Sequence, residues 1–169
     1  MPSVVRIGGV DKLELLQDLR THKVQLNRAA DMLFEDSRFV PLGQSQVVEI
    51  VALSVAELSF GEGATYRQLT ARARELGLAE CPLELGPHLR MQFLDQPEGS
   101  AGFPATPHRV PPGSITVASV PLDERDETPK GFYLRRIDGV PWLRGYWSWA
   151  GHTWSPEDRF VFVRGGVAA

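Results

Sequence analysis

Apolar residues in the first eighty positions recur mainly at helical spacing and predict three helices. Each predicted helix begins at a side chain able to accept hydrogen bonds from its own first turn. The predicted helices extend from Asp11 to about His22, from Asn27 to about Asp36, and over 66–76. Between the second and the third helix, the β-branched run 46–53 predicts a buried strand. This part of the chain, 1–80, is therefore expected to be rich in helix.

After Pro82 the pattern changes to alternation of apolar and polar residues, which is typical of strands. Strands are predicted over 89–94, 115–120, 132–137, 140–147 and 160–163. Five prolines and three glycines fall within 95–113, so this segment is predicted to be a long mobile loop. Ser155 followed by Pro156 is typical of the start of a one-turn helix.

Helices followed by an antiparallel meander predict an α+β fold. We expect the N-terminal helices to pack on one face of a mostly antiparallel sheet of about four to six strands. The chain, 1–169, is expected to form a single domain with a strand-rich part over 86–164. No alternation of strand and helix of the βαβ kind is present, which argues against a doubly wound nucleotide-binding fold.

Asp138-Gly139 separates two strand-like runs and is typical of a tight type I′ hairpin turn. That turn would place Ile137 opposite Val140 and would fix the register of the whole hairpin. One face is then apolar and should pack against the helices; it contains Phe132, Leu134, Leu143 and Trp147. The other face carries arginines that alternate with aromatic rings.

Seven residues of this second face and of the segment that follows it are candidate ligand- or partner-binding residues. They are Tyr133, Arg135, Trp142, Arg144, Tyr146, Trp149 and Trp154. In one interpretation they form self-contained cross-strand pairs and a loop whose rings close the end of the core. In the other they form a rigid platform for an anionic or planar ligand, a sugar or a partner protein, because Trp, Tyr and Arg are common anchor residues.

A second group of side chains has the chemistry of an acid–base site. Glu84, His88 and Arg90 are close in sequence, and His152 could join them in the fold. Such a set would supply a proton donor, a proton acceptor and an anion clamp. The structural interpretation is a surface carboxylate, a histidine in the turn after Gly86-Pro87 and an outward strand arginine.

Composition narrows the classes of partner. The net charge is −3, from 18 Lys and Arg against 21 Asp and Glu, and no block of basic residues occurs, so nucleic acid is not an expected partner. No run of apolar residues is long enough to span a membrane, and no signal-peptide pattern is present. With the single cysteine, Cys81, this favours a cytoplasmic protein. A monomer or weak dimer is expected.

The sequence predicts neither a cofactor nor a metal site. The four histidines are widely spaced, and no paired-cysteine or paired-histidine motif is present. The first hypothesis is therefore a non-catalytic module that binds an unidentified small ligand or protein through the Arg/aromatic hairpin face and the Trp-rich loop. The alternative is a small acid/base enzyme, which a shared polar pocket around His88 and His152 would favour.

Overall fold

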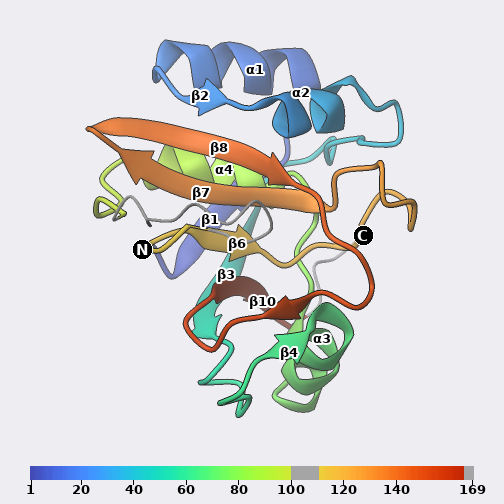
Figure 1. Cartoon of the computed structure of the whole chain (residues 1–169). Helices are drawn as coiled ribbons and strands as arrows, with labels where there is room; N and C mark the ends of the chain where they lie inside the picture. Colours follow the sequence, from blue (N-terminus) through green and yellow to red (C-terminus); the bar gives the residue numbers. More distant parts are fainter. Residues whose placement is uncertain (100–110, 166–169) are drawn as a thin grey trace.

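The computed structural model describes residues 1–99 and 111–165, and these form four helices and a curled, mostly antiparallel sheet (Figure 1). The helices are α1 (Lys12–Thr21), α2 (Arg28–Glu35), α3 (Tyr66–Glu75) and α4 (Leu85–Gln92). The longer strands are β1 (Val4–Ile7), β3 (Gln46–Ser54), β7 (Gly131–Ile137), β8 (Val140–Tyr146) and β10 (Arg159–Arg164). The short strands are β2 (Gln25–Leu26), β4 (Ala64–Thr65), β5 (Leu78–Ala79), β6 (Ile115–Val117) and β9 (Thr153–Trp154).

The main sheet has the order β1-β3-β10-β6-β7-β8-β2, and β5 pairs with β10. Its neighbours are antiparallel except for two parallel pairs, β10 with β6 and β2 with β8. β4 and β9 form a separate antiparallel pair. The sheet thus has more strands than the four to six expected. Strands of only two residues, such as β2 and β5, are too short to leave an alternating pattern in the sequence.

Local chemistry at the helix starts is as predicted. Asp11 accepts a hydrogen bond from the Glu14 amide while the Glu14 carboxylate accepts one from the Asp11 amide, closing a capping box at α1. Thr65 and Gln68 do the same for α3, and the Asn27 side chain caps α2. These caps depend only on neighbouring residues, which is why the sequence predicts them well.

The prediction of a strand over 89–94 is wrong, because most of this segment belongs to α4. Leu85, Leu89 and Phe93 are all buried, and their spacing of four residues places them on one side of a helix. Pro87 lies in the first turn, where an amide has no partner within the helix, so its missing N–H costs nothing. The alternation of Leu89 with its neighbours fitted a strand equally well, and long-range packing decided between the two.

The prediction that the N-terminal helices pack on one face of the sheet is wrong, because the helices are divided between its two faces. α1, α2 and α4 share a core with Phe132, Leu134 and Leu143 of the hairpin. Leu69 and Ala73 of α3 lie in a second core with Tyr133 and Tyr146, which point to the opposite face of the same strands. Figure 1 shows α1 and α2 above β8, and α3 beside β4 at the far end of the molecule.

The hairpin has the register expected from its turn. Asp138 and Gly139 have φ values of 51° and 77°, as a type I′ turn requires, and Ile137 lies opposite Val140. Gly145 faces Phe132 across the strands, but the space that it leaves is taken by the α2 backbone. A Cβ there would come within 2.6 Å of the Ala29 carbonyl carbon.

Three other segments differ from the sequence prediction. The strand predicted to reach residue 120 ends at Val117, and 155–158 forms a turn rather than a helix start. Residues 100–110 of the predicted mobile loop lie outside the described residues. Its described ends are anchored, because buried Gln96 donates hydrogen bonds to Gly113 O and Leu134 O, and the Gly99 amide donates one to Arg136 O.

Candidate functional site

Glu84 and His88 lie on α4 one turn apart and are both buried. The His88 Nε2 atom accepts a hydrogen bond of 3.1 Å from the Gly8 amide, which places the proton of the neutral ring on Nδ1. Glu84 Oε1 accepts a hydrogen bond of 2.9 Å from the Leu42 amide, and Oε2 lies 3.6 Å from His88 Nε2. Both side chains are thus used to hold backbone segments in place.

Gln92, one further turn along α4, bonds the same backbone segment as His88 does. Its side-chain amide accepts a hydrogen bond from Arg6 N and donates one to Arg6 O, at 3.0 and 2.8 Å. Together His88 and Gln92 satisfy the outward backbone groups at positions 6 and 8, along the free edge of β1. Covering a sheet edge in this way prevents it from pairing with another chain. No pattern in the sequence indicates this role, since it depends on where α4 packs.

Arg90 points away from this pair and lies beneath the hairpin. It is fully buried, and its guanidinium donates hydrogen bonds to Gln96 Oε1, to Arg135 O and to Phe93 O. Burial lowers the pKa of Arg90 to about 10, and the charge of Arg136 adds to this effect. Carbonyl and amide oxygens thus replace the carboxylate that a buried arginine commonly requires.

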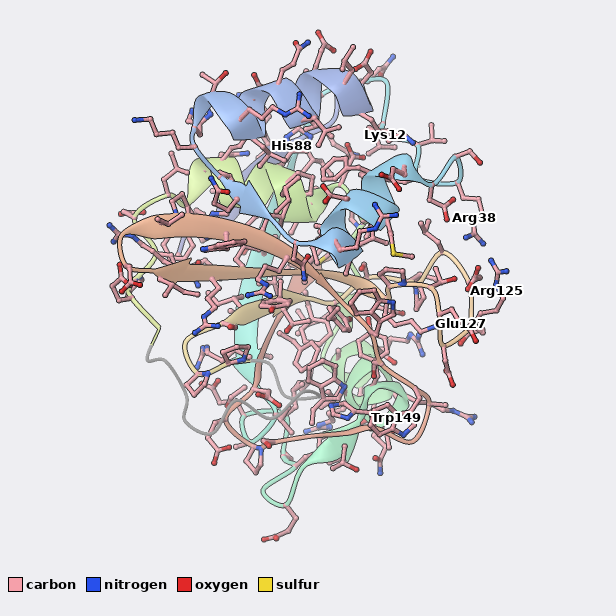
Figure 2. The ribbon with its side chains drawn as sticks, turned by 45° about the horizontal axis from the view of Figure 1, so that its top comes forward. Lys12, Arg38, His88, Arg125, Glu127 and Trp149 are labelled. Carbon is pink, nitrogen blue, oxygen red and sulfur yellow. The ribbon has the colours of Figure 1, made fainter. Side chains whose placement is uncertain are left out.

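His152 lies far from these residues, between the rings of Trp149 and Trp154, with ring centroids 5.0 and 4.8 Å away. Figure 2 shows His88 under α1 and Trp149 beside α3, well separated in the molecule. The structure therefore divides the four acid–base candidates among three places. It does not bring His88 and His152 into one pocket.

Four binding candidates lie together on the hairpin face that points away from the core of α1, α2 and α4. Tyr133 lies opposite Arg144, and Arg135 lies opposite Trp142. The Arg144 guanidinium carbon is 5.3 Å from the centre of the Trp142 ring and 6.0 Å from that of Tyr133. These distances place the Arg144 guanidinium within cation–π range of both rings.

Neither arginine on this face has an ionic partner. Among the residues that the structure describes, Arg135 and Arg144 have no carboxylate within 4 Å and no side-chain hydrogen bond, and both Nε atoms are buried. Arg135 is only 9% exposed. Burial lowers its pKa, the Tyr133 hydroxyl opposes this effect, and the charge of Arg144 lowers the pKa further. Two cations are thus held near each other without an anion.

The remaining aromatic candidates are mainly part of the packing. Tyr146 and Trp154 are buried in the second core and meet edge to face, with ring centroids 5.6 Å apart. Trp149 is about half exposed and packs against His152. Trp147 was expected on the core face of the hairpin, but it follows the end of β8 and is exposed. Its indole N–H donates to Glu127 O.

A hollow of about 290 Å³ lies on another side of the molecule, between α2 and the segment 125–129. Figure 2 shows Arg38, Arg125 and Glu127 along this side. Arg38 bridges Asp36 and Asp123, and Arg125 also bonds Asp123. Hydrogen bonds from Arg38 hold the pKa of Asp36 at about 2, and those from Arg125 and Arg38 hold that of Asp123 lower still. Arg38, Arg125, Asp36 and Asp123 are thus paired with one another.

Comparisons with protein-family models, curated proteins and solved structures returned no match for this chain. Within residues 1–99 and 111–165, no group of three or more His, Cys, Asp or Glu side chains is placed to hold a metal ion. No helix in this part of the chain is long and apolar enough to cross a membrane. The candidate site therefore rests on its own geometry, which is most developed on the Arg/aromatic face of the hairpin.

Proposed function

We propose that this protein is a binding module that takes an anionic group on the Arg/aromatic hairpin face, with Arg135 and Arg144 as the donors. One observation carries the proposal. Arg135 is nine-tenths buried, lies near Arg144, and neither side chain has a counter-charge or a hydrogen bond among the described residues. Leaving a charged group buried and unpaired costs free energy, so the arrangement favours the arrival of an anion.

The rest of the chain makes this pair of arginines unusual. Eight other arginines have a carboxylate within 4 Å; they are Arg28, Arg38, Arg72, Arg74, Arg125, Arg136, Arg159 and Arg164. Buried Arg90 is bonded by oxygen atoms of other residues. Among the described residues, Arg6, Arg20 and Arg67 also have no carboxylate within 4 Å, but all three are exposed to solvent. Arg135 and Arg144 lack such a partner at buried and half-buried positions, which supports a partner from outside.

The chemistry of the face favours a carboxylate or a phosphate. Guanidinium groups present parallel N–H donors that match two oxygen atoms at once. The Tyr133 hydroxyl is close enough to both arginines for their charges to oppose the rise in its pKa that burial causes. The side chains that β7 and β8 place on this face include no carboxylate.

The test is thermal unfolding in increasing concentrations of inorganic phosphate at constant ionic strength. A ligand that binds only the folded state raises the unfolding temperature. We expect a saturable rise in the wild type and its loss in Arg135→Gln and Arg144→Gln. Arg159→Gln is the matched control, since Arg159 also lies on a strand but is paired with Glu57. An equal rise in all four proteins, or none in the wild type, would contradict the proposal.

A further inference from the structure

We infer that the anion bound by Arg135 and Arg144 carries a flat apolar body, which lies on Trp142 and extends toward the hairpin turn. This inference rests on the proposed function and names the class of its ligand, an aryl carboxylate or a similar ring-bearing anion. It follows from what surrounds the two arginines on their face of the hairpin.

In one direction along the strands, the face is closed. Beyond Arg144 lies Tyr146, and Tyr133 lies directly opposite Arg144; both tyrosines are buried in the second core. Trp154 packs edge to face on Tyr146 and fills the next position. A ligand body has no room to extend this way unless it displaces packed rings, which would disrupt the second core.

In the other direction the face is accessible and apolar. Trp142, Val140 and Ile137 follow in turn toward Asp138-Gly139, and all three are only partly buried. This part of the face carries no charged side chain, because the alternation of the strands places Arg136 on the opposite face. From Trp142 to Val140 the strand rises by about 7 Å, the length of two fused six-membered rings.

Trp142 is suited to receive a flat ring. It is half-buried, so its position is fixed, and its ring is held against the Arg144 guanidinium at 5.3 Å. The cross-strand neighbours of Trp142 are Arg135 in β7 and Gln25 in β2, and Gln25 is exposed. Aromatic pairs contribute about 0.5–1.5 kcal/mol beyond the area they bury, so a ring on the anion should strengthen binding by up to about tenfold.

Isothermal titration calorimetry with three probes tests this inference. The probes are 2-naphthoate, which has an anion and a ring; acetate, which has the anion alone; and naphthalene-2-carboxamide, which has the ring alone. In the wild type we expect 2-naphthoate to bind about tenfold more tightly than acetate, and the carboxamide to bind more weakly than 2-naphthoate. Trp142→Leu should bring the ratio of 2-naphthoate affinity to acetate affinity close to one, while Trp142→Phe should keep most of the wild-type ratio.

Trp147→Leu is the control, because Trp147 is an exposed tryptophan away from this face and should affect none of the three probes. If 2-naphthoate binds no better than acetate, or keeps its advantage in Trp142→Leu, the inference is wrong. The proposed function still stands in that case if acetate binding requires Arg135 and Arg144. If neither anion binds, or if the carboxamide binds as well as 2-naphthoate, both the inference and the proposed function fail.

Discussion

The two faces of the β7–β8 hairpin are built from alternate residues of the same strands, yet they reach opposite outcomes. On one face Phe132, Leu134 and Leu143 are fully buried in a core made by three helices. On the other face buried rings give way to Arg135 and Arg144, which have no ionic partner among residues 1–99 and 111–165. A fully packed apolar face gains no stability from a ligand in solution, whereas a buried cation without a partner is stabilised when an anion binds to it. The difference therefore locates binding on the second face.

The contrast is sharpest between two buried arginines that lie on either side of β7. Arg90 lies on the α4 side of β7, and its guanidinium donates a hydrogen bond to the backbone oxygen of Arg135. Arg90 has oxygen partners from the hairpin, from Gln96 and from Phe93, while the Arg135 side chain has none among the described residues. Both arginines leave a buried Nε without a partner, so the difference lies in the terminal N–H groups. Those of Arg90 are hydrogen-bonded, and those of Arg135 have no hydrogen bond among the described residues.

The largest effect is expected on the apolar face. Leu134→Ala and Leu143→Ala should each lower the free energy of unfolding by about 2–5 kcal/mol, because each leaves a cavity in a closed core. Arg144→Ala should lower it by about 1 kcal/mol or less, the scale of a cross-strand pair. Denaturant titration of the three variants measures these values. Equal losses in all three would show that the two faces are packed alike.

An intermediate effect is expected at Arg90. Replacing it in Arg90→Leu leaves the oxygens of Gln96, Phe93 and Arg135 without their donor in a buried place. Buried polar groups left without partners cost about 1–3 kcal/mol, so the variant should unfold at clearly lower urea concentration than the wild type. Unchanged stability would mean that these oxygen atoms find other donors, and that the hydrogen bonds of Arg90 do not stabilise the fold.

A small effect of the opposite sign is expected at Arg135. In a buffer of weakly binding anions, Arg135→Gln removes an unpaired buried charge and should be as stable as the wild type or slightly more stable. The same urea titration measures it. A loss as large as that of Arg90→Leu would show that the Arg135 guanidinium supports the fold itself, and would weaken the claim that it waits for a ligand.

The smallest effect concerns pH and the paired arginine Arg38. The Asp36 carboxyl has its pKa lowered from 3.8 to about 2 in the folded state, so its bonds to Arg38 stabilise the fold above pH 4. This contribution is lost as the pH falls from 4 through 2. The unfolding temperature of the wild type should therefore fall slightly more steeply in this range than that of Arg38→Gln. Parallel curves would mean that the exposed pair contributes nothing.

The sequence predicted those parts of the fold that depend on neighbouring residues. The Asp138-Gly139 turn determined the hairpin register, and capping residues marked the starts of α1, α2 and α3. α4 was missed because Leu89, Met91 and Phe93 fit a strand as well as a helix. The second core was missed because α3 and β9, which cover Tyr133 and Tyr146, come from distant parts of the chain.

The candidate site was predictable only in part, for the same reason. Alternation from the turn was sufficient to place Tyr133, Arg135, Trp142 and Arg144 on one face. It could not show that Tyr133 is buried in a second core, or that the Arg135 side chain has no partner among the described residues, because both depend on tertiary packing. The edge-covering role of His88 likewise required the position of α4 against β1.

The most direct test of the anion site observes the arginine side chains themselves. In ¹⁵N-labelled protein, the Nε–H resonances of Arg135 and Arg144 should shift saturably with inorganic phosphate, and both should give the same dissociation constant. The resonances of Arg159 and Arg164, which are paired with Glu57 and Glu49, should not follow that curve. Resonances of Arg135 and Arg144 that stay in place, or that move only as those of Arg159 and Arg164 do, would contradict the account.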